Sequence, residues 1–344
     1  MATIKDISKA LHVSVSTVSM ALNDSKEISE KTKLRVRETA VAMNYVRNGS
    51  AVNLQRKKTN TILFITDNPT RPYFTDSLRV LQDAVAKEGF DLIIATSSVK
   101  NSRSTERLLT ERRADAVICW SQFVSMKLIQ QCASAEMPIF TMGRADEIED
   151  NPYVFNLNVH QNRAGEEITT YLLHQGMRRI AFVHNENNSA GSDYRKRGYL
   201  QALQNFGPEV SPIVFNIESS DYDAGYTVTE KQLTPKILAH QIDAIFYTND
   251  DVAVGGLHCF LKMNISVPDQ VSIVGYNNYP SSKLVLPQIT TVSLHEREIM
   301  QRTADGLIHL LCQSADLESI RAMLSDIALN SEIIERDTVK RVIK

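Results

Sequence analysis

From residue 61 onward, short apolar runs alternate with stretches of amphipathic helical periodicity, and this alternation constrains the fold more than any other feature of the sequence. Apolar strands joined by helical crossovers are typical of a parallel sheet that helices cover on both faces. The predicted strands span residues 61–66, 91–96, 116–120, 138–142, 154–158, 179–183, 212–217, 244–248 and 271–276. Predicted helices such as 74–88 and 161–175 lie between them. This number of strands is too large for one compact sheet of this kind. We therefore predict two doubly wound α/β lobes, with the default small-molecule site between them.

The first 45 residues have a different pattern, which predicts three short helices. Thr3 and Asp6 have the spacing of a capping box. Ser14 and Ser29 stand where N-caps of the next two helices are expected. The predicted helices are 3–11, 15–22 and 30–44, and the apolar positions of the third include Leu34, Val41 and Met43. Three helices with a tight turn between the first two predict a helix-turn-helix domain.

The charges are distributed unevenly along the chain. Residues 1–58 contain 11 Lys and Arg against 5 Asp and Glu, whereas the rest of the chain contains 27 against 35. A basic segment attracts polyanions by counterion release, and an acidic body is repelled by them. A merely solvated terminus is the alternative interpretation. The polar stretch 46–60 predicts a linker, because it has too few apolar residues to hold a helix on its own.

Several function classes have no support in the sequence. The GxGxxG, GxxxxGK[ST], GxSxG and HExxH patterns are absent, so we predict no enzyme, no cofactor and no metal site. An enzyme whose site assembles only in space stays a distant alternative. No apolar run reaches about 18 residues, and the first residues lack a signal-peptide core. The four cysteines are far apart in the sequence. These features predict a cytoplasmic protein with reduced thiols and no membrane association.

Residues 2–23, ATIKDISKALHVSVSTVSMALN, resemble the opening of the LacI/GalR family of bacterial transcription regulators. The family pattern is a short helix, then V-S-x-x-T-V-S, then a helix that ends in Asn. Here the pattern is Val13–Ser19 followed by Asn23. The resemblance continues through ISEKTKLRV and over the body, in Asn249-Asp250 followed by AVGGL, in VPDQVSIVGY, in LPQITTV and in LNSEIIERDT. It therefore covers nearly the whole chain.

The resemblance implies an all-α helix-turn-helix head followed by an α/β body of two periplasmic-binding-protein-like lobes. The predicted domains are residues 1–47 for the DNA-binding head, 48–58 for the hinge helix, 59–160 with 291–323 for the first lobe, and 161–290 with 324–344 for the second lobe. A periplasmic sugar-binding protein is the alternative for the body alone. The basic head argues against that alternative.

In the family, the second helix lies in the major groove of DNA. Val15 and Ser16 would then meet base edges. Met20 either makes an apolar base contact or packs inside the head, and many family members have Arg at this position. Thr17, Ser19 and Asn23 are similar to the family's phosphate contacts, with helix capping as the alternative role. The DNA-binding residues predicted in the head are Thr3, Lys5, Ser14, Val15, Ser16, Thr17, Ser19, Met20 and Asn23.

Leu54 is similar to the hinge leucine that family members insert into the minor groove, where it kinks the duplex. Ala51 permits close approach to the groove, and Asn48 can cap the hinge helix. Arg47 stands where members often have Pro, and Gly49 weakens the start of this helix. An ordinary tether is the alternative interpretation. The predicted DNA-binding residues of the hinge are Asn48, Ala51, Leu54 and Gln55.

The resemblance also implies an effector pocket. Arg195, in Arg195-x-x-Gly198-Tyr199, matches a family arginine that hydrogen-bonds the effector. Tyr73 and Phe74 are similar to the aromatic pair of purine-binding members. For these two residues and Tyr222, a place in the hydrophobic core is the alternative. The predicted effector-binding residues are Tyr73, Phe74, Arg144, Arg195, Tyr222, Asn249, Asp250 and Asn277.

Two positions leave the class of effector open. Asn277 and Gly143 stand where family members often have Asp, so the pocket is predicted to tolerate an anion such as a sugar phosphate or a uronate. A neutral sugar hydrogen-bonded by Asn277 is the favoured alternative.

These features together predict a homodimeric repressor that binds a pseudo-palindromic DNA operator under the control of a sugar or sugar derivative. A purine- or nucleoside-responsive repressor is the alternative, and a cytoplasmic sugar-binding protein or an enzyme is a distant one.

Overall fold

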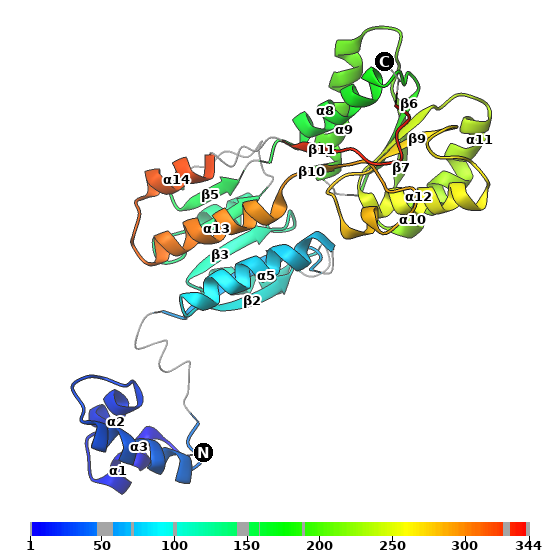
Figure 1. Ribbon diagram of the computed structural model, residues 1–344. Coiled ribbons are helices and arrows are strands. Elements are labelled where there is room, and N and C mark those ends of the chain that lie inside the picture. The colour runs from blue at the N-terminus through cyan, green and yellow to red at the C-terminus, as the bar shows by residue number, and fades with distance from the viewer. Residues whose placement is uncertain are drawn as a thin grey trace. The chain divides into compact units, whose positions relative to one another are not determined.

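The computed structural model describes residues 2–46, 58–69, 72–98, 102–142, 151–157, 159–187, 190–325 and 331–341, without the side chains of residues 72–76 and 190. The chain divides into two compact units, Met1–Thr59 and Asn60–Lys344. The first is helical and the second is an α/β body, which confirms the predicted fold class (Figure 1). Within the described residues, no helix combines the length and the apolar character that crossing a bilayer requires.

The first unit contains three helices, α1 (Ile4–Leu11), α2 (Val15–Leu22) and α3 (Glu30–Ala42). Their caps are those the sequence predicts. The Asp6 carboxylate accepts the Thr3 backbone N–H at 2.9 Å, and the Ser14 hydroxyl accepts the Thr17 backbone N–H at 3.0 Å. Ser29 caps α3 in the same way. The core of the unit contains Ile7, Val18, Ala21, Val36 and Ala40.

Two apolar residues of α3 lie outside this core. Leu34 is 58% exposed and Val41 is 77% exposed, whereas Met43 packs against the core. The buried face of α3 follows Val36 and Ala40. Leu34 is two residues before Val36 and Val41 is one residue after Ala40, so neither lies on that face of the helix. The apolar character of a residue therefore does not by itself place it in the core of this head.

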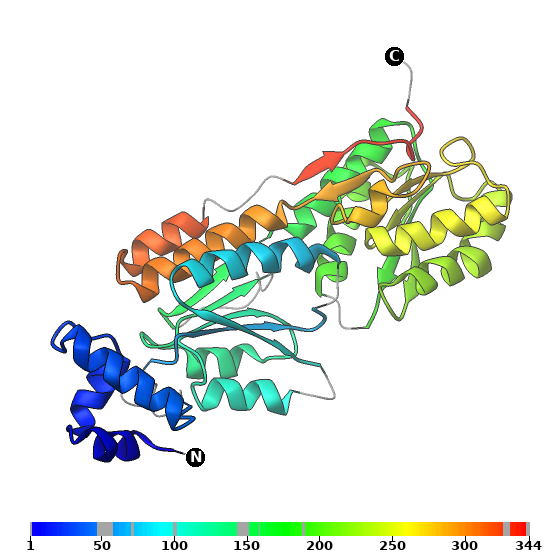
Figure 2. The ribbon, with the colours of Figure 1, turned by 60° about the horizontal axis from the view of Figure 1, so that its bottom comes forward.

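The second unit contains a five-stranded parallel sheet in the order β2-β1-β3-β4-β5. Its strands are β1 (Thr61–Thr66), β2 (Asp91–Thr96), β3 (Ala116–Trp120), β4 (Ile139–Met142) and β5 (Val154–Leu157). One face packs against α5 (Pro72–Lys87), α13 (Glu296–Leu311) and α14 (Leu317–Ser325), and the other against α6 (Arg103–Thr110) and α7 (Met126–Cys132). Figures 1 and 2 both show α5 and α13 side by side.

The second sheet is also parallel and has the order β7-β6-β8-β9. Its strands are β6 (Ile180–Asn185), β7 (Ile213–Ile217), β8 (Ala244–Tyr247) and β9 (Ser272–Val274). The helices α8 (Gln161–His174) and α9 (Ala190–Phe206) cover one face. The other face packs against α10 (Tyr222–Val228), the π-helix η1 (Thr229–Leu233), α11 (Thr234–Leu238) and α12 (Asp250–Lys262). The 3₁₀-helix η2 (Pro280–Lys283) follows β9.

A short antiparallel pair, β10 (Thr291–Ser293) with β11 (Glu332–Ile334), was not among the predicted strands. The two strands are far apart in the sequence, so their pairing leaves no local pattern by which they could be predicted. After β10 the chain returns to the first sheet, where α13 and α14 complete its core. Val292, Ile333 and Val339 pack in the core of the second sheet. The predicted limits of the two lobes stay a proposal.

Candidate functional site

A cavity of about 260 Å³ lies within the second unit, where the carboxyl ends of the strands of both sheets face it. In doubly wound sheets this is the end at which ligands bind. The lining residues are Asp67, Trp120, Gln122, Phe123, Met142, Val159, Gln161, Asn185, Asn187, Gly191, Arg195, Ser220, Asn249, Asn277, Tyr279, Leu294, Glu296 and Ile299.

The first sheet contributes a carboxylate and a set of apolar groups. Asp67 follows β1 directly, and Trp120 is the last residue of β3. Trp120 packs edge-on against Phe64, with ring centroids 5.6 Å apart, which fixes the indole at the cavity. Gln122 and Phe123 come from the loop after β3. This side of the cavity therefore offers flat apolar surface beside one acidic group.

Arg195 of α9 is the principal cation of the cavity and is almost completely buried. It donates from Nη1 to Gln161 Oε1 at 2.8 Å and from Nη2 to Thr248 Oγ1 at 3.3 Å. Its guanidinium carbon lies 4.5 Å from the centroid of the Tyr276 ring. These contacts fix the plane of the guanidinium, so a ligand meets donors that are already oriented.

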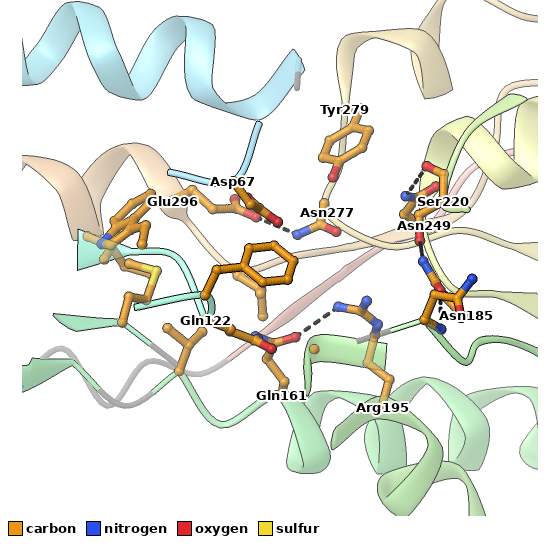
Figure 3. Close-up of a pocket in the computed structure, with 18 residues that line it drawn as sticks. Asp67, Gln122, Gln161, Asn185, Arg195, Ser220, Asn249, Asn277, Tyr279 and Glu296 are labelled. Atoms are coloured by element: carbon orange, nitrogen blue, oxygen red, sulfur yellow. Dashed lines mark hydrogen bonds between the residues drawn. The ribbon is translucent and has the colours of Figure 1, made fainter. Parts of the chain in front are cut away.

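Side chains at the ends of β6, β7 and β8 form a hydrogen-bonded edge. Asn185 Nδ2 donates to Ser220 Oγ at 2.6 Å, and Asn249 Nδ2 donates to the Ser220 carbonyl at 3.0 Å. Asn249 Oδ1 accepts the Val252 N–H at 2.9 Å, so this residue is also the N-cap of α12. Figure 3 shows these amides on the same side of the cavity as Arg195.

A second acidic group comes from α13. Glu296 Oε1 accepts a hydrogen bond from Asn277 Nδ2 at 2.9 Å, and burial raises the pKa of Glu296 above its ordinary value. Figure 3 shows Asp67, Asn277 and Glu296 pointing toward one another. Asn277 has a φ of 89°, a left-handed conformation that Asn tolerates better than most residues. The cavity therefore combines one guanidinium with two carboxyl groups.

Three of the predicted effector residues, Arg195, Asn249 and Asn277, line the cavity together. Asp250 does not line it. Its carboxyl group is fully buried and accepts hydrogen bonds from the Tyr279 N–H at 2.5 Å and the Thr291 hydroxyl at 2.6 Å. Burial raises the pKa of Asp250 to about 8. The residue thus joins α12 to the loop after β9 and to β10, instead of meeting a ligand.

Tyr222 also lies away from the cavity lining. It is the first residue of α10, its side chain is 39% exposed, and its hydroxyl lies 3.0 Å from His258 Nδ1. Ser220, two residues earlier, is the residue of this segment that lines the cavity. Neither a ligand-stacking role nor a core position matches the place of Tyr222. The backbones of Tyr73 and Phe74 lie in α5, and Arg144 lies outside the described residues.

Several cavity residues were missed by the sequence analysis, above all Asp67, Gln122, Asn185 and Glu296. Asp67, Gln122 and Asn185 lie one or two residues after the predicted strands 61–66, 116–120 and 179–183. A polar residue just after a parallel strand is the signal that could have identified them, because ligands bind at that end of the sheet. Glu296 has no such signal in its own segment. It reaches the cavity because the chain returns to the first sheet after β10.

In the head, the N-terminal end of α2 presents small side chains to solvent. Val15 is 40% exposed and Ser16 is exposed, whereas Met20 is half-buried. The Ser14 hydroxyl caps α2 and lies 2.6 Å from Ser16 Oγ. Thr3, Lys5 and Asn23 are exposed, and Thr17 and Ser19 are half-buried. The predicted hinge contacts Asn48, Ala51, Leu54 and Gln55 lie outside the described residues.

The sequence matches two family models that together cover most of the chain. Residues 3–48 match the model of bacterial regulatory proteins of the lacI family. Residues 59–332 match the model of periplasmic binding proteins and the sugar-binding domain of the LacI family. The chain belongs to the LacI family. This LacI-family protein is thus a DNA-binding transcriptional regulator with an effector-binding body, which confirms the resemblance seen in its sequence.

Curated relatives match this LacI-family protein over almost its full length. It is 28% identical to the probable HTH-type transcriptional repressor ExuR of Bacillus subtilis, over 99% of each chain. It is 24% identical to the ribose operon repressor of Escherichia coli, over 96% of this chain and 98% of the relative. It is 23% identical to the HTH-type transcriptional repressor PurR of Pasteurella multocida, over 99% of each chain.

Solved structures share the fold. A LacI-family regulator from Silicibacter pomeroyi has a TM-score of 0.80 at 23% identity, over 99% of this chain and 100% of that one. The lac repressor dimer bound to operator has a TM-score of 0.76 at 19% identity, over 98% of each chain. A LacI-family regulator from Enterococcus faecium with bound ribose has a TM-score of 0.67 at 20% identity, over 82% of this chain and 100% of that one.

Proposed function

We propose that this regulator is a repressor whose affinity for operator DNA is controlled by a neutral sugar in the cavity of the second unit. The observation that carries the proposal is the composition of this cavity, in which fixed donors and acceptors surround a flat apolar surface. Ribose in the structure of the Enterococcus faecium regulator and the name of the ribose operon repressor support the same ligand class.

The polar groups suit a ligand with many hydroxyls. Each sugar hydroxyl both donates and accepts a hydrogen bond, so it requires both kinds of partner in the pocket. Arg195 and Gln122 supply donors, and the carboxyl groups of Asp67 and Glu296 supply acceptors. Trp120 and Phe123 offer apolar surface to the C–H faces of a sugar ring.

The charges favour a neutral sugar over an anionic one. Asp67 lines the same cavity as Arg195, so an anion that approaches the guanidinium also approaches this acidic group. Glu296 lines the cavity too, but burial raises its pKa, so the repulsion rests mainly on Asp67. An ionised carboxylate close to a bound phosphate or uronate is unfavourable at the low dielectric of a closed pocket. The cavity therefore contains acidic groups from other elements, although positions 143 and 277 have no Asp.

A screen of thermal stabilisation tests the ligand class. A ligand that binds the folded protein raises its melting temperature by mass action. We expect a neutral pentose or hexose to stabilise the full chain at millimolar concentration. We expect pentose 5-phosphates, hexose 6-phosphates, hexuronates and free purines to have little effect. Stabilisation by an anionic sugar alone, or by a purine alone, would replace the neutral sugar as effector.

We propose that DNA is bound by the exposed end of α2. Val15 and Ser16 face the bases with Met20 one turn later, and Thr17, Ser19 and Asn23 face phosphates. Thr3, Lys5 and Ser14 are assigned to the same DNA surface, and Asn48, Ala51, Leu54 and Gln55 to a hinge in the minor groove. The lac repressor bound to operator, which has the same fold, supports this assignment.

We propose that the active form is a homodimer. The edge strand β2 exposes Ile93 (47%) and Ile94 (46%), and the segment after η2 exposes Leu284 (83%) and Leu286 (77%). An exposed apolar edge strand invites pairing with another chain unless something covers it. A second copy of this chain is the proposed cover, and the dimeric lac repressor supports it.

A further inference from the structure

A buried histidine next to the cavity belongs to none of the roles described above. His184 is the penultimate residue of β6, and its side chain is buried. Its Nδ1 lies 2.9 Å from the hydroxyl of Ser192, which is completely buried in the first turn of α9. Its Nε2 faces Asp193 Oδ1 at 3.4 Å. The imidazole thus joins a buried hydroxyl to an exposed carboxylate.

These contacts fix the tautomer of His184. A carboxylate only accepts hydrogen bonds, so the neighbouring Asp193 favours a proton on Nε2 of the neutral ring. Nδ1 is then an acceptor, and the Ser192 hydroxyl donates its proton to it. With its proton directed there, Ser192 Oγ accepts the Asn185 N–H at 2.9 Å and the Thr248 hydroxyl at 3.0 Å.

The same chain of hydrogen bonds ends at the arginine of the cavity. Thr248 is completely buried, and its Oγ1 accepts from Arg195 Nη2 at 3.3 Å. Every donor along the path points in one direction, from Arg195 through Thr248 and Ser192 to His184. Polarised chains of this kind hold their members in one orientation.

We propose that His184 is a positioning residue that orients Arg195 for the effector through Ser192 and Thr248, and that protonation of His184 weakens effector binding. The effect on binding rests on the proposed function, because it requires Arg195 to contact the effector. A protonated His184 has a hydrogen on Nδ1, so it can no longer accept from Ser192. The Ser192 hydroxyl must then turn away, and the direction of the chain is lost.

The charges around His184 define the pH range of this effect. Burial is the main cause that lowers the pKa of His184, and Lys196 and Arg195 of α9 lower it further. Asp193 and Glu186 act in the opposite direction and are outweighed. The imidazole is therefore neutral at pH 7 and takes up its proton only below its ordinary value of 6.5. Effector affinity is expected to fall in that acidic range.

Nuclear magnetic resonance of the full chain, labelled with ¹⁵N in its His and Arg side chains, tests the relay without any ligand. At pH 7 we expect the His184 Nδ1 signal to be that of an unprotonated nitrogen and the Nε2 signal that of an N–H. As the pH falls, the guanidinium signals of Arg195 should shift with the same midpoint as the imidazole of His184. A protonated Nδ1 at pH 7 would overturn the proposed direction of the chain.

Conservative variants separate the relay from general changes in charge. His184→Asn keeps an acceptor near Ser192 but does not titrate, so the shift of the Arg195 signals should disappear. Ser192→Ala should leave the titration of His184 in place and reduce the accompanying shift of the Arg195 signals to the part that the charge of His184 exerts through space. The matched control is His309→Asn. His309 lies on α13, its Nδ1 is 2.7 Å from Ser314 Oγ after the end of that helix, and neither residue lines the cavity.

An Arg195 signal that follows pH equally in wild type and in His184→Asn would contradict the relay. The experiment requires no effector, so its failure is distinct from failure of the proposed function. A sugar that stabilises the protein would support the proposed function even if the relay proved absent.

Discussion

At the scale of single residues, Gly191 sets how closely two side chains of the cavity approach. A Cβ atom at this position would lie 2.9 Å from Gln161 Oε1 and 3.3 Å from Arg195 Nη1. Gly191→Ala should therefore displace the guanidinium without unfolding the protein, because both contacts are ends of flexible side chains. We expect a loss of about tenfold in sugar affinity, or ~1.4 kcal/mol, measured by calorimetry.

Gly198→Ala provides the contrast on the same helix. Its Cβ atom would lie 1.9 Å from the backbone oxygen of Asn162, where α9 crosses α8, so this variant should lose stability instead. A Gly191→Ala protein that melts as early as Gly198→Ala would show that Gly191 acts in packing and not in the orientation of Arg195.

Asp250 gives the second prediction at this scale. Because burial raises its pKa from 3.8 to about 8, folding favours the protonated form. The stability that this shift contributes is fully present below the unfolded value and is lost as the pH rises toward 8. Between pH 4 and pH 8, the unfolding free energy of wild type should fall relative to that of Asp250→Asn, by at most about 1.4 kcal/mol per pH unit.

Denaturant unfolding of both proteins at several pH values measures this difference. Parallel pH profiles for wild type and Asp250→Asn would contradict a protonated Asp250 in the folded state.

Asn249 and Asp250 also show how far the sequence could predict the site. The pair follows the predicted strand 244–248 directly, and in the structure Asn249 is the N-cap of α12 and Asp250 is its first residue. An N-cap residue has an extended backbone, whereas the next residue is already helical, so the two side chains point in different directions. Only Asn249 lines the cavity. The sequence analysis gave Asn249 and Asp250 the same role because they are adjacent, but the backbone directs their side chains to different places.

At the scale of elements, the apolar periodicity was sufficient for the long strands and most helices. It failed where tertiary contacts decide, as in β10 and β11, whose three-residue strands pair over about 40 residues of sequence. It also gave no sign that Leu34 and Val41 are exposed, because an exposed apolar residue on a helix has no signature of its own. The cavity position of Glu296 could not be predicted either, since it depends on the tertiary packing of α13 against the first sheet.

The prediction at this scale concerns the two helices of the head that are proposed to contact DNA, α2 with Ser16 and α1 with Lys5. Val15 and Ser16 are its exposed N-terminal residues, and it contains no charged side chain. If Ser16 faces bases, Ser16→Ala should change the sequence preference but not the salt dependence of binding. If Lys5 faces a phosphate, Lys5→Ala should weaken all sequences alike and reduce the salt slope by about one.

Selection of bound sequences from a random DNA pool, followed by titrations at several salt concentrations, measures both effects. The prediction is wrong if Ser16→Ala selects the same sequences as wild type with unchanged discrimination. A Lys5→Ala protein with an unaltered salt slope would remove Lys5 from the DNA surface.

At the scale of the whole molecule, control of DNA affinity requires that ligand binding change the population of a DNA-competent state. The cavity is suited to this role because its lining comes from both sheets of the body. A ligand that bridges Asp67 and Arg195 binds differently when the separation of the two sheets changes. A ligand can shift a conformational equilibrium only if it binds the two conformations with different affinities.

Dimerisation extends this argument, because two heads bind a two-fold symmetric operator only when they belong to one assembly. Ile93→Lys places a charge on the exposed edge strand β2, and Leu286→Lys does so after η2. If these residues pack against a second copy, each variant should sediment as a monomer, since burying an unpaired charge is costly. The monomer should keep weak nonspecific DNA binding but lose specific affinity by about a hundredfold or more, because one half-site is read instead of two.

Leu238→Lys is the matched control: this leucine is 62% exposed on α11, and its variant should sediment and bind like wild type. A wild-type protein that sediments as a monomer, or an Ile93→Lys variant with unchanged mass and DNA affinity, would exclude β2 from the interface.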